Sequence, residues 1–172
     1  ESFLKAIRSL ETGVFHLHKK KFDEERPEAL LEYVKIGTDD RVYAIGQLLR
    51  LGRPVSEIAE ATGIDRFFLD KMQKIVEMEE TLRNHPGDLD TLYEAKRMGV
   101  SDQAVAGFWN MNETNVFALR KKHGMFPVYK MIDTCASEFE SYVPYFYSTY
   151  EEENEAILEN KKKILVLGSG PI

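Results

Sequence analysis

Residues 48–69 read LLRLGRPVSEIAEATGIDRFFL, and residues 95–119, AKRMGVSDQAVAGFWNMNETNVFAL, repeat their pattern. In both stretches a helix ends at Arg-x-Gly, and the chain restarts with Val-Ser and an acidic residue. An apolar residue followed by Ala comes next, and a turn (Gly-Ile-Asp or Asn-Met-Asn) leads into another helix. The offset of 45 to 47 residues predicts a doubled helical unit. Since one helical repeat rarely buries its own apolar face, we expect the two units to pack on each other.

Outside the repeat, the helices are predicted from apolar residues at helical spacing and from residues that cap helix ends. These signals predict a helix over 2–12 before Gly13, a loop over 13–27, and a helix after Pro27 that closes at Gly37. A further helix is predicted with Thr38 as N-cap, with Asp39 and Asp40 in its first turn, and with its end at Gly52. The last two are a helix that is capped by Ser56 and broken at Gly63, and a helix that is capped by Asp65.

The composition describes a globular protein with a core, because 43% of the 172 residues are apolar and 30% are charged. The net charge of −6 provides no overall field that would attract nucleic acid or anionic lipid. A single cysteine excludes a disulfide framework and favours a cytoplasmic location. No apolar run approaches the roughly 20 residues that a membrane span needs. The chain starts without Met, and we expect it to be a piece of a longer protein.

The character of the sequence changes after Gly124. Residues 126–150, FPVYKMIDTCASEFESYVPYFYSTY, contain eight of the nineteen aromatic residues, and we expect an extended strap lying against a helical surface. Residues 151–160 form an acidic connector, and 161–172, KKKILVLGSGPI, read as a buried strand entering a glycine-rich loop. The predicted fold class is all-α: a helical bundle of two small helical units, with an extended aromatic-rich C-terminal strap and one terminal β-strand.

Two clusters invite a metal or catalytic interpretation, and we assign neither. His16 and His18 could share one face of a strand, but no further ligand at a fitting spacing is evident and a run of three lysines follows. We predict a solvated loop there. Cys135 has no histidine tied to it as a base, so we predict a buried small apolar side chain rather than a nucleophile.

Residues 56–74 have the spacing of a helix-turn-helix, with Ile58, Ala59, Gly63 and Ile64 at the key positions. The second helix carries four acidic and three basic residues over 65–79 and would repel phosphate. We predict that its side chains Phe67, Phe68 and Leu69 are buried in a core.

The remaining charged and glycine-rich groups also have structural explanations. The basic residues Arg120, Lys121 and Lys122 lie at a helix C-terminus, where the helix dipole favours them. The carboxylates Glu151, Glu152, Glu153 and Glu155 are predicted to be a solvated linker. The loop at 168–171 lacks the helix that a phosphate site needs.

Several strings resemble the large chain of carbamoyl phosphate synthetase, and the resemblance extends over essentially the whole sequence. The strings are RSLETG (8–13), IDRFFL (64–69), PVYK (127–130), DTCASEF (133–139), YSTYEEE (147–153) and VLGSGP (166–171).

The resemblance implies a helical oligomerisation domain between two ATP-grasp synthetase halves. Residues 1–12 would be the last helix of the first half, 13–125 the oligomerisation domain, 126–160 a linker, and 161–172 the first strand of the second half. The parent enzyme would make carbamoyl phosphate from bicarbonate, glutamine-derived ammonia and two ATP, for arginine and pyrimidine biosynthesis.

The family's catalytic residues match nothing in this sequence, so no catalytic, cofactor-binding or metal residue is assigned. The parent enzyme would use ATP with magnesium or manganese ions, and potassium ions. This segment would hold no cofactor and would be inactive alone. Implied partners are the flanking synthetase halves, a small glutaminase chain through the parent, and further copies of the chain, without nucleic acid or membrane. The alternatives are a helix-turn-helix-like nucleic-acid-binding module and an autonomous enzyme.

Overall fold

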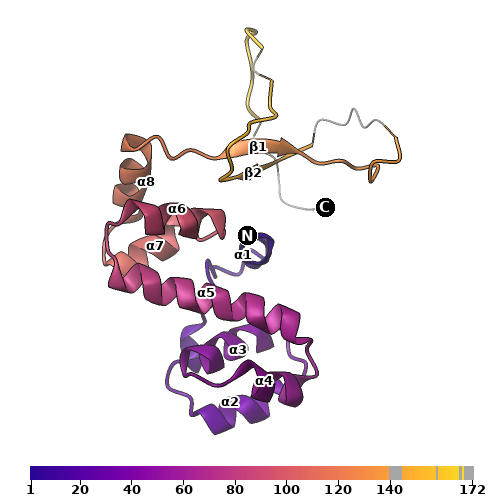
Figure 1. The fold of residues 1–172 in the computed structure, drawn as a ribbon, viewed down its shortest axis with the longest axis vertical. Helices are drawn as coiled ribbons and strands as arrows, with labels where there is room; N and C mark the ends of the chain where they lie inside the picture. The colour runs from indigo at the N-terminus through magenta and orange to yellow at the C-terminus, as the bar shows by residue number, and fades with distance from the viewer. Residues whose placement is uncertain (140–144, 158, 167, 169–172) are drawn as a thin grey trace. The chain divides into compact units, whose positions relative to one another are not determined.

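The computed structural model describes residues 1–139, 145–157, 159–166 and 168, which form eight α-helices and a two-stranded sheet (Figure 1). The predicted all-α fold class is confirmed. The chain divides into two compact units, residues 1–116 and 117–172. The helices are α1 (Ser2–Ser9), α2 (Pro27–Val34), α3 (Arg41–Arg50), α4 (Val55–Thr62), α5 (Arg66–Asn84), α6 (Leu89–Arg97), α7 (Asp102–Trp109) and α8 (Glu113–Lys122), with a short 3-10 helix η1 (Lys20–Phe22).

The doubled helical unit is confirmed, and equivalent positions lie 47 residues apart. The helices α4 and α7 have eight residues each, and both end at a residue in the left-handed conformation, Gly63 with φ 69° and Asn110 with φ 52°. Glycine and asparagine are the residues that adopt this conformation most readily, so both turns follow from the sequence. The next helix then starts at Arg66 in the first helical repeat and at Glu113 in the second.

Of the two predicted N-cap residues, Asp65 caps its helix and Ser56 does not. The carboxylate of Asp65 accepts a hydrogen bond of 2.8 Å from the Phe67 amide. Ser101 likewise caps α7 through the Ala104 amide at 3.1 Å. Ser56 lies inside α4, because Pro54 is the last extended residue and the helix begins at Val55.

The helix predicted to start after Thr38 begins two residues later than expected, at Arg41 with Asp40 at the N-cap position. The carboxylate of Asp40, predicted for the first turn, instead accepts hydrogen bonds from Lys21 and from the Tyr33 hydroxyl, the latter at 2.6 Å. A tertiary contact therefore uses the side chain that the local pattern assigned to the helix. The helix predicted over 2–12 ends at Ser9, since Glu11 has a positive φ of 52°.

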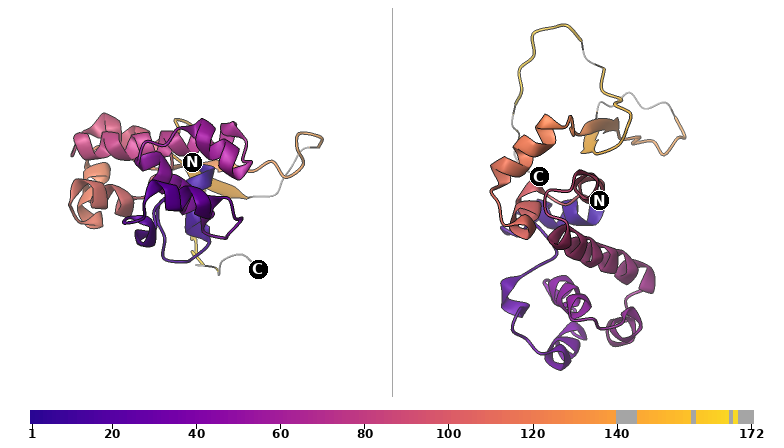
Figure 2. Two further views of the ribbon diagram at one scale, coloured as in Figure 1. Left: turned by 90° about the horizontal axis from the view of Figure 1, so that it is seen from below. Right: turned by 60° about the vertical axis from the view of Figure 1, so that its left-hand side comes forward.

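The long helix α5 organises the first unit (Figure 2). It packs against α3 and α4 of the first repeat and against α6 and α7 of the second. Its buried residues recur along one face, as expected for a helix between two layers. They are Leu69, Met72, Ile75, Glu79 and Leu82. The second repeat is fixed to α5 by Trp109, whose indole N–H donates to the Leu82 carbonyl at 2.8 Å.

The second unit contains the aromatic segment. Two of its stretches are extended, as predicted, and pair with each other, whereas residues 134–139 form turns and bends and 140–144 lie outside the described residues. Strands β1 (Val128–Met131) and β2 (Phe146–Thr149) are antiparallel, with Val128 opposite Thr149. Residue 155 occupies the other edge of β1: its amide donates to the Tyr129 carbonyl at 2.9 Å, and its carboxylate accepts from the Met131 amide at 2.6 Å. The expected terminal strand is not formed by residues 161–166 or 168, and the rest of 161–172 lies outside the described residues.

Candidate functional site

The most deeply buried charged group of the first unit is Glu79, whose residue is 1% exposed. Its carboxylate accepts hydrogen bonds from Arg50 Nε at 2.7 Å, from Arg50 Nη2 at 2.6 Å and from His16 Nε2 at 2.8 Å. The Arg50 guanidinium also donates to the Leu17 carbonyl and reaches the Gln47 amide oxygen at 3.5 Å. These bonds connect the loop before α2 with α3 and α5.

The electrostatics of this cluster favour the ionised carboxylate. Burial acts to raise the pKa of Glu79, but the hydrogen bonds and charges of Arg50 and His16 outweigh it and hold the pKa at about 2. An ion pair of this kind stabilises the fold only when all of its members are present, since a single buried charge is strongly unfavourable. The cluster therefore acts as a polar connection between three segments.

A cleft of about 480 Å³ opens beside the cluster. It is lined by residues from the loop before α2 and from α3, α5 and α7, among them His18, Asp23, Arg83, Gln103 and Phe108. The Arg83 guanidinium lies 4.6 Å from the centre of the Phe108 ring, and the His16 ring meets the same phenyl ring edge to face. The charged groups at its floor are directed to one another, and among the described residues the His16 Nδ1 has no hydrogen-bond partner.

Two further polar clusters have the same structural character. Asp40 accepts from Lys21 and Tyr33, and these bonds outweigh burial and lower its pKa to about 2. Lys96, in α6, is buried and donates to the Val100 carbonyl and to the Asp102 carboxylate, each at 2.8 Å. Both clusters fix chain segments next to helix starts.

The histidine prediction was wrong for His16 and missed the partner of His18. His16 is buried against Glu79 rather than solvated, because a carboxylate 63 residues further along the chain approaches it. His18 is half-exposed and pairs with Asp23 at 2.7 Å. The two imidazoles therefore bind different carboxylates. No group of three or more His, Cys, Asp or Glu side chains within the described residues could hold a metal ion.

In the second unit, Cys135 is half-buried rather than buried, because it lies in a turn made by the Asp133 carboxylate. That carboxylate accepts from the amides of Cys135 at 2.9 Å and Ser137 at 2.6 Å. These backbone hydrogen bonds lower the pKa of Asp133.

The four carboxylates of the acidic linker are exposed, as predicted, and two of them also contact other residues. Glu155 binds the Met131 amide, which lowers its pKa, and both Glu155 and Glu153 reach Lys130, at 3.4 and 3.5 Å. Glu151 and Glu152 are exposed, as predicted. The glycine-rich loop at 168–171 lies outside the described residues except for Gly168.

The basic residues at the end of α8 differ in their surroundings. Arg120 is buried, donates to the Met125 carbonyl at 3.0 Å and lies over the rings of Phe117 and Tyr150, so it fixes the end of α8. Lys121 and Lys122 are exposed.

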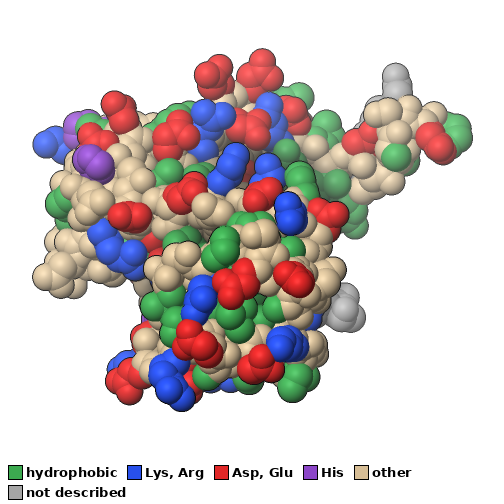
Figure 3. Space-filling view, turned by 60° about the horizontal axis from the view of Figure 1, so that its bottom comes forward, with side chains coloured by type: hydrophobic (Ala, Val, Ile, Leu, Met, Phe, Trp, Pro, Cys, Tyr) green, Lys and Arg blue, Asp and Glu red, His purple; other side chains and the backbone are tan. Residues whose placement is uncertain are grey.

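The helix-turn-helix pair is formed by α4 and α5, with the turn at Gly63. The prediction that Phe67 and Phe68 belong to a core was wrong: they are 58% and 61% exposed, while Leu69 is fully buried. In the space-filling view of Figure 3, acidic and basic side chains are interspersed. A DNA-binding face would instead gather basic side chains.

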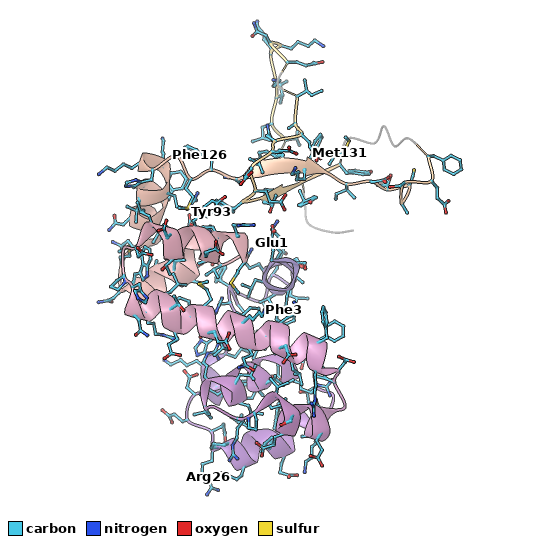
Figure 4. The ribbon with its side chains drawn as sticks, viewed as in Figure 1. Glu1, Phe3, Arg26, Tyr93, Phe126 and Met131 are labelled. Atoms are coloured by element: carbon cyan, nitrogen blue, oxygen red, sulfur yellow. The ribbon has the colours of Figure 1, made fainter. Side chains whose placement is uncertain are left out.

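The two phenylalanines border an apolar groove of about 580 Å³ between α1 and the first half of α5, which we call the α1–α5 groove. Figure 4 labels Glu1 and Phe3 on the α1 side. Its apolar lining includes Phe3, Ala6, Phe67, Phe68, Met72 and Ile75. Exposed apolar surfaces of this kind are found where proteins contact another protein, a membrane or a ligand.

The described part of the chain contains no helix that is both long and apolar enough to cross a membrane. Its notable features are buried ion clusters that connect helices and an exposed apolar groove.

The comparison with known families agrees with this description. The sequence model of the family "Carbamoyl-phosphate synthetase large chain, oligomerisation domain" matches residues 1–124, which include the first compact unit and all of α8. The match covers both helical repeats and most of the chain. The chain therefore belongs to the family of carbamoyl-phosphate synthetase large chain oligomerisation domains.

Proposed function

We propose that this domain is a non-catalytic spacer and self-association module between two ATP-grasp synthetase halves of a carbamoyl-phosphate synthetase large chain. The family match supports the placement in such a chain. The parent enzyme would form carbamoyl phosphate from bicarbonate, glutamine-derived ammonia and two ATP in the cytoplasm. Its product would supply arginine and pyrimidine biosynthesis.

The observation that carries the non-catalytic role is the way in which the buried charges are used. Glu79, Arg50 and His16 bind one another, and Lys96 binds Asp102 and a backbone carbonyl. A catalytic acid, base or nucleophile must instead be directed at a site that substrate can enter. These groups hold the helices in a fixed arrangement, which suits a part that sets the positions of active sites elsewhere.

The cofactors belong, in this proposal, to the synthetase halves. ATP with Mg or Mn, and K, would bind there, and the small glutaminase chain would supply ammonia to the parent. Residues 161–172 would begin the second half, so the glycine-rich loop at 168–171 would contribute to that half rather than to the helical domain.

Two measurements on the purified chain test the proposal. Light scattering over a concentration series should show a rise in mass, because the isolated domain keeps a self-association surface. An ATPase assay with bicarbonate, ammonia and carbamate should show no turnover above a buffer control. A mass that stays monomeric up to several hundred micromolar contradicts the self-association role, and ATP turnover contradicts the non-catalytic role.

A further inference from the structure

The cleft beside the Glu79 cluster has the size of a small-ligand site, with a volume of about 480 Å³. It lies wholly within the first unit, where the loop before α2 and the helices α3, α5 and α7 line it. We call it the Arg83 cleft, after the more exposed of its two arginines. A cleft built from four segments of one unit has its shape fixed before a ligand enters.

Most of the charged groups that line the Arg83 cleft are already bound to one another. At the floor, the Glu79 carboxylate accepts two hydrogen bonds from Arg50 and one from His16. At the side, His18 and Asp23 form a pair at 2.7 Å. Both carboxylates of the lining therefore have hydrogen-bond donors beside them, which weakens their repulsion of an anion.

Arg83 differs from these groups because much of its hydrogen-bonding capacity is unused. A guanidinium has several N–H donors, and among the described residues Arg83 reaches one carboxylate only, that of Glu79, at 3.5 Å. Its side chain is 49% exposed, and its guanidinium lies 4.6 Å from the centre of the Phe108 ring. A guanidinium that an aromatic ring orients and that water can reach is suited to binding a carboxylate or phosphate.

The α7 side of the cleft leaves room for a ligand. Gly107 is exposed in the interior of α7, where glycine is less favourable than any residue except proline. A Cβ added at Gly107 would meet no atom of the described residues within 4 Å, so packing does not require a glycine there. Gln103, in the first turn of the same helix, is exposed, and its side-chain amide binds no other described residue. The lining thus combines an open surface with an unused polar group.

We propose that the Arg83 cleft binds a small organic anion. Its carboxylate or phosphate pairs with the Arg83 guanidinium and the Gln103 amide, and its apolar body lies over Gly107 beside Phe108. Such a ligand contacts α5 of the first repeat and α7 of the second together, so it stabilises the arrangement of the two repeats. This inference goes beyond the spacer role, because a spacer needs no ligand.

The first test is a titration of the purified 172-residue chain, followed by the backbone amide chemical shifts of α7. The probes are benzoate, phenyl phosphate, inorganic phosphate and benzamide, the last being the neutral counterpart of benzoate. Benzoate or phenyl phosphate should bind with a Kd on the order of 1 mM, and the tighter of the two identifies the preferred head group. Benzamide should bind at least about tenfold more weakly, because it lacks the charge that Arg83 recognises.

Three results of this titration overturn the proposal. One is the absence of shifts with both organic anions up to about 20 mM. Another is equal binding of benzamide and benzoate, which excludes recognition of the charge. The third is binding of inorganic phosphate as tightly as phenyl phosphate, which excludes a contact with the apolar body.

Variants then locate the bound anion. Arg83→Gln should weaken the binding at least about tenfold, and Arg97→Gln, which alters an exposed arginine of α6 outside the cleft, should leave it unchanged. Gly107→Leu should also weaken it at least about tenfold, since the new side chain enters the cleft, while leucine favours the helix and keeps the fold. Urea unfolding followed by Trp109 fluorescence checks that fold. Unchanged binding in Gly107→Leu, or in a folded Arg83→Gln, overturns the proposal.

Discussion

Replacing Glu79 with alanine should destabilise the first unit strongly. The substitution removes the acceptor of two hydrogen bonds from Arg50 and of one from His16 and leaves the Arg50 charge without its counter-ion at a largely buried position. Breaking a buried ion pair by removing one member costs about 3 to 5 kcal/mol. With a urea dependence of about 1.5 kcal/mol per molar, the unfolding midpoint should fall by about 2 to 3 M.

The assay is urea unfolding followed by the fluorescence of the single tryptophan. Trp109 is buried and hydrogen-bonded to the carbonyl of Leu82, so it reports on the packing of α7 against α5. The matched control is Glu80→Ala, which removes an exposed carboxylate from the neighbouring position of the same helix. The control should change the free energy of unfolding by no more than about 0.5 kcal/mol.

The pH dependence of the same equilibrium tests the electrostatic part of the argument. The folded-state pKa of Glu79, about 2, lies below its ordinary value of 4.5. A carboxylate of this kind stabilises the fold above the unfolded pKa, and the stabilisation is lost as the pH falls through the folded pKa. The difference corresponds to about 3 kcal/mol, lost between about pH 5 and pH 2.

Glu79→Gln should accordingly lose less stability than the unmodified chain over this pH range, because its side chain does not titrate. Since Asp40 titrates in both proteins, the difference between the two curves isolates Glu79. Two results would refute the reasoning. One is a free energy of unfolding for Glu79→Ala that lies within about 0.5 kcal/mol of that of the Glu80→Ala control. The other is a free energy of unfolding that falls with decreasing pH in parallel for Glu79→Gln and the unmodified chain.

Three further predictions concern backbone positions and the sheet edge. Gly99→Ala should lower the free energy of unfolding by about 2 kcal/mol more than Gly52→Ala in urea titrations, because both glycines have positive φ but only Gly99 approaches another backbone; equal losses would contradict this. Asn110→Ala should cost about 1 kcal/mol in the same assay and Asn110→Gly close to nothing, since the φ of 52° disfavours alanine; the reverse order would exclude the backbone explanation. Glu155→Ala should raise the hydrogen-exchange rate of the Met131 amide by about tenfold, because that amide loses its acceptor, and an unchanged rate would show that the carboxylate does not protect it.

The sequence predicts well the features that depend on a few neighbouring residues. The turn at Gly63 needs only a residue that tolerates the left-handed conformation, and the cap at Asp65 needs only an amide two residues away. Both were predicted correctly. The doubling of the unit was equally accessible, because the same local signals recur along the chain.

The features that depend on distant residues were not predicted. His16 looked solvated beside a run of lysines, and its burial depends on Glu79, 63 residues away. Asp40 was assigned to a helix start and is used by Lys21 and Tyr33 instead. An apolar pattern also does not distinguish a core residue from one at an interface, so Phe67 and Phe68 were placed with Leu69 although they face outward.

The position of α5 has a consequence for how this domain can be divided. In most repeat proteins each repeat meets its neighbour along a single interface, and removing one repeat shortens the array. Here the 19-residue helix α5, which belongs to the first repeat, packs against α3 and α4 and also against α6 and α7 of the second repeat. Truncation within it would expose both cores at once, so the domain should melt as one cooperative block and be inherited or transplanted only whole.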